Sequence, residues 1–212
     1  RSNFIKTLIS IILFVIIVYK INYRYKILTI FLIFFSSYLV FSITDGDYKQ
    51  RYSKQIKSIF SSNGLTKYLE GSKYGAHRNV AKEIFLDNSL FGVGIKNFRV
   101  ESANKKYDKL DHKKNHLRVS NHPHELYYEW LSETGIFGLI CFLIFILSSI
   151  LLALKNFIKS KNIYQLSALI FVTVSILPIL PTGSFLSTYT SSIFWINYAI
   201  MMGYNNIQET KF

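Results

Sequence analysis

The chain contains little cysteine and little acid. Its 212 residues include a single cysteine, Cys141, so no disulfide can form within the chain and no cysteine-based metal site exists. Aspartate and glutamate number 12 against 25 lysines and arginines, which gives a formal net charge of +13. Nucleic-acid binding would use such a charge, but no nucleic-acid motif is present and the basic residues lie beside apolar segments. We therefore expect no nucleic-acid partner.

The start of the chain also lacks the marks of a secretory signal. No initiator methionine precedes the first apolar run, and no small-residue cleavage site follows it. We expect the chain to be the C-terminal part of a longer membrane protein that ends in a polar cytoplasmic tail at residues 205–212.

Long apolar runs are what the sequence has in abundance. Half of the residues are apolar, and a membrane-spanning helix needs about 20 mostly apolar residues in a row. The runs occupy residues 4–19, 27–43, 136–154, 166–180 and 186–204. The predicted fold is therefore all-α: a polytopic membrane protein with about five transmembrane helices in this chain. Pro178 and Pro181 should kink or end the fourth helix.

The short loops orient these helices. Residues 20–26 and 155–161 are strongly basic and nearly free of acids, so both should face the cytoplasm. This orientation divides residues 1–204 into three units. They are two transmembrane helices in residues 1–43, a large extracytoplasmic loop in 44–135, and three transmembrane helices in 136–204. The loop in residues 44–135 would then lie outside the cytoplasm.

The large loop should be partly helical. Residues 47–60 and 78–88 have apolar side chains at helical spacing, with charged side chains between them. Gly92 and Gly94 should end a helix and permit a tight turn. The loop is therefore expected to carry amphipathic helices and the candidate active site.

The most informative stretch is NHPHELYYEWLSETGIFG, residues 121–138. Asn121 is a good N-cap, so the sequence predicts a helix over residues 122–133 that ends at Gly135. The positive end of a helix dipole disfavours imidazolium, and a neutral imidazole can accept a proton as a general base. His124 is the leading catalytic candidate, with His122 second.

The residues alone leave other interpretations open. The two histidines could instead form a polar loop that caps the helix at the membrane interface. They could also bind a metal together with His112 and His116, although no acidic cluster accompanies them. Four basic side chains of the loop could hold phosphate or could be solvated surface charges: Arg78, Lys96, Arg99 and Arg118.

The acids of the same stretch are equally ambiguous. Glu125, Glu129 and Glu133 recur every four residues, a spacing typical of a solvated helix face. Glu133 could instead pair with a basic residue.

Two blocks of the loop resemble the signature of the O-antigen ligase and O-antigen polymerase family. In one block His124-Glu125 is followed by nine residues and then by Gly135-Ile136-Phe137-Gly138. In the other, Arg78 precedes a helical stretch and then LFGVG, which contains Gly92 and Gly94. Glu125 departs from the amide or hydroxyl residue that the family prefers, which puts the acceptor in doubt more than the reaction.

The resemblance implies a metal-independent glycosyltransferase without a cofactor. Its donor would be a glycan on undecaprenyl pyrophosphate, and its acceptor a sugar hydroxyl on lipid A core or on another lipid-linked glycan. His124 would act as the base and Arg78 would offset charge on the pyrophosphate. The alternatives are an O-linked protein glycan ligase, and a membrane transporter of the kind associated with bicarbonate uptake. Few charges lie inside the apolar segments, which favours an enzyme over a transporter.

Overall fold

The structure is a computed structural model that describes residues 2–18, 22–43, 46, 70–177 and 183–204. Within these ranges all regular structure is helical and no strand occurs. The predicted all-α class is therefore confirmed. The predicted helix over residues 47–60 and the predicted tail at residues 205–212 lie outside the described residues.

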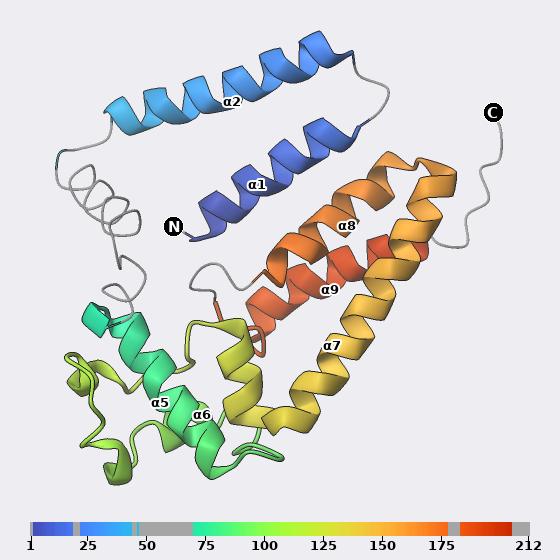
Figure 1. Ribbon diagram of the computed structural model, residues 1–212. Coiled ribbons are helices and arrows are strands. Elements are labelled where there is room, and N and C mark those ends of the chain that lie inside the picture. The colour runs from blue at the N-terminus through green and yellow to red at the C-terminus, as the bar shows by residue number, and fades with distance from the viewer. Residues whose placement is uncertain (1, 19–21, 44–45, 47–69, 178–182, 205–212) are drawn as a thin grey trace.

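The apolar runs form the upper part of the molecule in Figure 1. They give helices α1 (Ser2–Ile17), α2 (Tyr23–Ile43), α7 (Leu126–Ser160), α8 (Ile163–Ser175) and α9 (Thr188–Gly203). In the described part of the chain, α2 with 21 residues and α7 with 35 are long and apolar enough to cross a membrane. α1, α8 and α9 have 16, 13 and 16 residues, so five membrane spans stay a prediction.

Helix α8 ends close to Pro178, as predicted. Its last residue is Ser175 and its C-cap is Ile176, although the apolar run continues to residue 180. A proline ring disfavours helical conformation in the residue before it.

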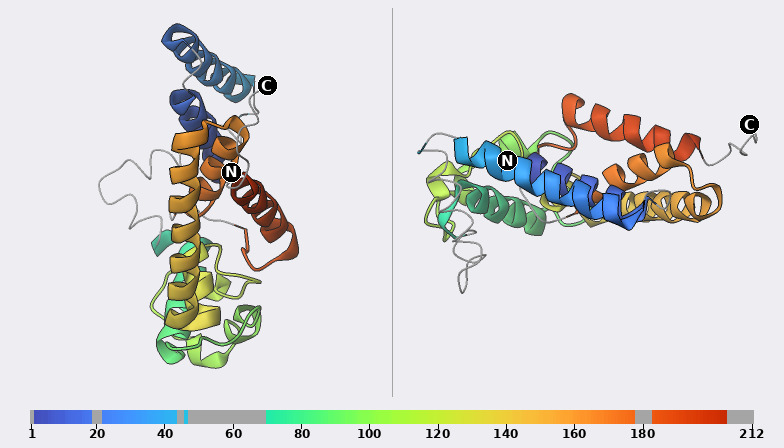
Figure 2. Two further views of the ribbon diagram at one scale, coloured as in Figure 1. Left: turned by 90° about the vertical axis from the view of Figure 1, so that its right-hand side faces the viewer. Right: turned by 90° about the horizontal axis from the view of Figure 1, so that it is seen from above.

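Helices α7, α8 and α9 share one apolar core. Phe142 and Ile146 of α7 pack with Leu169 and Val172 of α8 and with Phe194 of α9. α1 packs against α8. α2 packs against α1 and buries none of its side chains, and the views in Figure 2 show these two helices beside the other three. A helix that is apolar on every face suits a lipid environment.

Helix α7 has two arms, because the backbone leaves helical geometry at Gly135 (φ 68°, ψ −170°). Residues 126–134 form a short arm, and residues 136–160 form a long arm that runs among the apolar helices (Figure 1). The predicted end of a helix at Gly135 is therefore found as a sharp change of direction within α7.

Residues 70–125 form the lower part of the molecule in Figure 1. They contain α5 (Lys73–Asp87), the short α6 (Phe98–Glu101) and two 3₁₀ turns, η1 (Lys105–Tyr107) and η2 (Asn115–Leu117). Their core joins Val80 and Ile84 of α5 to Phe98 and Tyr107. The predicted apolar face of α5 is confirmed, but the helix begins at Lys73 rather than Arg78 because Ser72 caps it by accepting a hydrogen bond from Gly75 N at 3.1 Å.

Candidate functional site

The glycines of the two sequence blocks meet each other. Val93 N donates to Ser132 O and Gly94 N donates to Glu133 O, while Ile136 N donates to Ser89 O, each at 2.9 Å. These bonds hold the loop after α5 against the junction between the two arms of α7. The loop and the junction are therefore one rigid unit.

At Gly92 and Gly135 only glycine fits. Both have positive φ, 65° and 68°. A Cβ at Gly92 would lie closer than 3.0 Å to the backbone of Glu133, and one at Gly135 equally close to the backbone of Leu90. The two glycine motifs thus pair for a steric reason. Gly92 lets the backbone of α7 come close to the loop, and Gly135 lets the loop backbone come close to α7.

Glu133 of α7 binds the loop that follows α5. Its Oε2 accepts a hydrogen bond from Lys96 N at 2.6 Å, and the carboxylate is almost fully buried. Glu129 is buried in the same way: it accepts a hydrogen bond from Phe185 N at 2.7 Å and another from the Ser184 hydroxyl. Glu129 and Glu133 therefore do not lie on a solvated helix face, and the partner found for Glu133 is the backbone N–H of Lys96 rather than a basic side chain. These acids fasten α7 to the loops before α9 and after α5.

Glu125, the third acid of this series, begins the helix. It is the N-cap of α7, and its Oε2 accepts a hydrogen bond from Tyr128 N at 3.0 Å. The predicted start of this helix at Asn121 is therefore wrong, and His122 and His124 lie in the turn that precedes it. Burial raises the pKa of the Glu125 carboxyl, while two backbone amides and the positive charges of Arg78 and Lys6 oppose that rise.

The histidines gather beside α5. The rings of His122 and His124 have centroids 3.9 Å apart, and His124 lies in the left-handed region at φ 60°. On its other side His124 stacks on His77 of α5, at 5.2 Å and 23° between planes. Tyr74, one turn earlier in α5, meets the His124 ring edge-on at 5.1 Å. Three imidazoles and one phenol thus form one cluster.

His77 was not found from the sequence. It is buried at 5% exposure, and its Nδ1 has no hydrogen-bond partner in the part of the chain that the structure describes. Burial lowers its pKa below 6.5, with smaller contributions from the positive charges of Lys73 and His122, and a hydrogen bond with the backbone of Leu117 opposes the shift. The ring is therefore neutral near neutral pH. The i, i+4, i+7 spacing of His77, Ala81 and Ile84 is the signal that could have revealed it.

Arg78 lies beside this cluster. Its guanidinium carbon is 5.0 Å from the ring centroid of Tyr128, and Nη2 donates to the Tyr128 hydroxyl at 3.4 Å. Its charge also acts on Glu125. A guanidinium held against an aromatic face keeps other N–H donors for an anion such as a phosphate.

Two of the other predicted basic residues are placed elsewhere. Lys96 and Arg99 lie beyond the C-terminal end of α5 and are exposed. The eleven helical steps from His77 to Asn88 rise about 16 Å along a helix axis, so these two side chains belong to the glycine end. Arg118 pairs with Asp108 and directly follows Leu117, whose backbone forms a hydrogen bond with His77.

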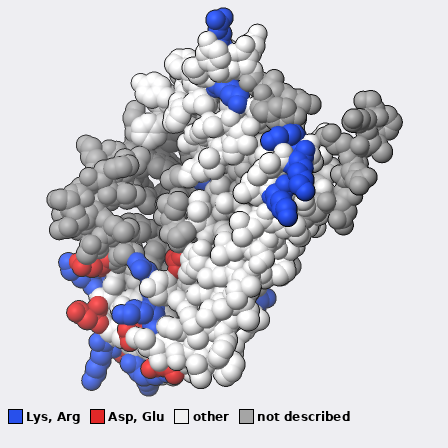
Figure 3. Space-filling view, turned by 45° about the vertical axis from the view of Figure 1, so that its right-hand side comes forward, with Lys and Arg blue, Asp and Glu red and all other residues white. Residues whose placement is uncertain are grey.

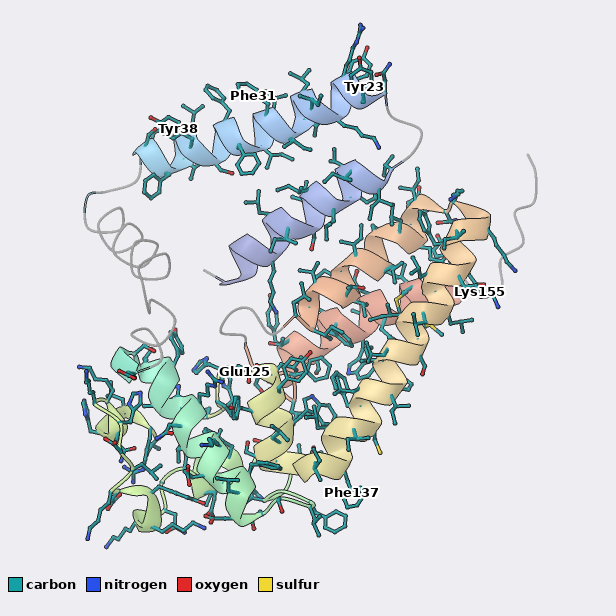
Figure 4. All side chains as sticks on the ribbon, in the orientation of Figure 1. Tyr23, Phe31, Tyr38, Glu125, Phe137 and Lys155 are labelled. Carbon is teal, nitrogen blue, oxygen red and sulfur yellow. The ribbon has the colours of Figure 1, made fainter. Side chains whose placement is uncertain are left out.

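The histidine end of the short arm faces the ends of the apolar helices. Tyr127 donates its hydroxyl proton to Ile176 O at 2.8 Å, and Lys6 Nζ donates to Ser175 O at 2.9 Å, so α1, α7 and α8 meet here. Figure 4 shows Glu125 close to these ends and Phe137 at the far end of the short arm. The cluster therefore lies where the loop segment joins the apolar helices.

Metal binding has no support from the described residues, among which no group of three or more His, Cys, Asp or Glu side chains is arranged to hold an ion. His112, one of the histidines considered as a ligand, accepts a hydrogen bond from Lys114 N at 3.0 Å through Nδ1.

Comparison with known proteins agrees with the two sequence blocks. A family model described as O-antigen ligase matches residues 1–143, which include α1, α2, the whole loop segment and the start of the long arm of α7. The chain belongs to this family, whose members are embedded in membranes and transfer glycans in polysaccharide synthesis. No curated protein matches the chain.

Proposed function

We propose that this protein transfers a glycan from undecaprenyl pyrophosphate to a sugar hydroxyl, with His124 as general base and Arg78 as the pyrophosphate clamp. The acceptor is lipid A core or a second lipid-linked glycan. The observation that carries the proposal is the stacking of His77 on His124. It brings the histidine of one family block against the helix turn that holds Arg78 of the other block.

The chemistry follows from these two side chains. His124 removes the proton from the acceptor hydroxyl, and the oxygen forms a bond to the anomeric carbon of the donor. The bond from that carbon to the pyrophosphate oxygen breaks, and undecaprenyl pyrophosphate leaves with the bonding electrons. A diphosphate is a good leaving group, so the main electrostatic task is to offset its charge, which the guanidinium of Arg78 does.

The position of the cluster supports a lipid-borne substrate. The donor pyrophosphate lies at the membrane surface because its lipid remains in the bilayer, and the cluster lies at the ends of α1 and α8. In this proposal residues 44–135 face the periplasm or the cell exterior, and the protein spans the inner membrane several times. Lys96 and Arg99 are weaker candidates because they lie beyond the other end of α5, whereas Arg118 is a second candidate because it follows Leu117, whose backbone forms a hydrogen bond with His77.

The test is the full-length protein with His124→Ala, expressed in a bacterium that lacks its own chromosomal copy. His116→Ala is the matched control, because His116 is an exposed histidine of the same loop. The surface polysaccharide is separated on a gel, and membrane levels of both variants are compared by immunoblot.

Loss of long chains in His124→Ala but not in His116→Ala supports the proposal. The glycan that remains in the His124→Ala cells then identifies the reaction. Lipid-linked polymer that accumulates indicates a ligase, whereas single repeats on the core indicate a polymerase. Unchanged polysaccharide at an equal membrane level contradicts the catalytic role of His124.

A further inference from the structure

An exposed aromatic pair lies at the glycine end of the loop segment, away from the histidines. Phe91 is 73% exposed and Phe137 52% exposed, and their rings stack with centroids 5.5 Å apart. Leu86, Leu90 and Ile95 beside them are exposed as well. Soluble surfaces seldom carry several large apolar side chains together, and such patches usually mark an interaction site.

The pair continues a stripe on the long arm of α7. The exposed apolar residues there recur every three or four positions, which places them on one face of the helix: Phe137, Ile140, Ile144, Leu147 and Leu151. The chain belongs to a membrane-embedded family, and its helix α7 is long enough to span the bilayer. An uncharged stripe of this kind on a helix long enough to cross the bilayer suits contact with lipid.

The loop cannot swing away from that stripe. Ser89 O accepts from Ile136 N at 2.9 Å and Leu90 O accepts from Phe137 N at 3.4 Å, so residues 89–91 run beside the first turn of the long arm. The close approach at Gly92 and Gly135 fixes the same register. Phe91 is thus held at the outer end of this stripe.

Charged side chains leave a broad part of the surface free. Figure 3 shows lysine, arginine and acidic side chains at the lower left and lysine or arginine again at the upper end, with an uncharged surface between them. Exposed basic residues of the segment include Lys82 of α5, Arg99 of α6 and Lys105 of η1.

We propose that Leu90, Phe91 and Phe137 form a lipid anchor, in which the loop after α5 inserts into the outer edge of the bilayer and contacts the acyl chains of membrane lipids. Aromatic rings at the boundary between lipid and water are favoured because they bury their apolar body. Because the loop is rigidly joined to both α5 and α7, the anchor fixes the height of the histidine cluster above the membrane. The inference rests on membership of a membrane-embedded family and not on the role of His124.

Single cysteines make the test direct, and every other cysteine of the full-length protein is first replaced by serine. Cys141 lies exposed on the long arm of α7, one turn beyond Phe137, so a nitroxide there reports a position on the exposed stripe. In the same background with Cys141→Ser, Phe91→Cys receives the same label, and Lys105→Cys is the matched exposed control. The full-length proteins are placed in phosphatidylethanolamine and phosphatidylglycerol vesicles. Collision rates with oxygen and with a water-soluble nickel complex are then measured by power-saturation EPR.

The anchor predicts that the label at position 91 collides with the nickel complex several-fold less often than the label at 105, while oxygen access stays high, as at Cys141. A label at position 91 that meets nickel as often as the one at 105 overturns the proposal. So does a label that neither reagent reaches, because protein and not lipid would then cover the patch. Polysaccharide synthesis by Phe91→Cys is irrelevant to these outcomes, which keeps them separate from the test of His124.

Discussion

The imidazole of His77 stacks on the imidazole of His124, with ring centroids 5.2 Å apart and planes inclined by 23°. One ring comes from the buried face of α5 and the other from the turn that precedes α7. His124 has φ 60°, a conformation that non-glycine residues rarely adopt without support. We infer that His77 is a positioning residue that holds the His124 ring in place.

Replacing His77 tests this role. His77→Ala removes the stacked ring and is expected to lower kcat by about 10- to 100-fold, because small displacements of a catalytic group are costly. His77→Phe restores a flat ring and should recover most of the rate, with KM for the acceptor unchanged in both. Rates come from glycan transfer by protein in vesicles. If Phe is no better than Ala, stacking is not what positions His124.

The buried His77 also predicts a pH dependence of stability. Its folded pKa lies below the ordinary 6.5, so between the two values the unfolded chain binds more protons than the folded one. The contribution of His77 is complete above about pH 6.5 and is lost as the pH falls toward the folded pKa. Thermal unfolding in detergent should therefore show the natural protein losing more stability than His77→Phe between about pH 7.5 and 5.5. Equal losses would contradict a buried neutral imidazole.

Gly92 and Gly135 should not tolerate alanine. Each Cβ would meet backbone closer than 3.0 Å at a positive φ, so each change is expected to destabilise the protein by about 2 kcal/mol or more. Gly71→Ala is the matched control, since a Cβ there meets nothing within 4 Å. Thermal unfolding of the three variants in detergent measures the difference. Similar melting temperatures for all three would show that the two backbones do not meet as described.

Glu125 should act as a helix cap whose negative charge is dispensable. Its Oε2 accepts from Tyr128 N, which a glutamine side chain can also do. Glu125→Gln should keep the natural stability, whereas Glu125→Ala should cost about 1 kcal/mol. A loss of stability in Glu125→Gln equal to that in Glu125→Ala would show that the charge, with Arg78 and Lys6 nearby, is what matters.

The helices could be predicted well from the sequence because apolar runs and their periodicity are local signals. The apolar face of α5 and the break at Gly135 follow from spacing alone. The start of α7 could not be predicted correctly, since Asn121 and Glu125 are both acceptable caps and tertiary packing chooses between them. The burial of Glu129 and Glu133 was missed for the same reason: their partners, Phe185 N and Lys96 N, lie far away in the sequence.

Only part of the candidate site could be predicted from the sequence. His124 and Arg78 stand in recognisable blocks, but His77 has no motif, and only the packing of α5 on the short arm of α7 brings it to His124. Lys96 and Arg99 show the converse. Their charge made them candidates, and their position beyond the far end of α5 is a property of the fold.

Transfer by purified protein in vesicles tests the central claim most directly, with a pyrophosphate-linked lipid glycan as donor and its natural acceptor. His124→Ala is compared with His116→Ala at equal protein, and the rate of formation of the glycosidic product is measured. Loss of a general base predicts a rate lower by about 10²- to 10⁴-fold in His124→Ala, with His116→Ala unchanged. A folded His124→Ala variant that transfers glycan as fast as the His116→Ala control would contradict the account.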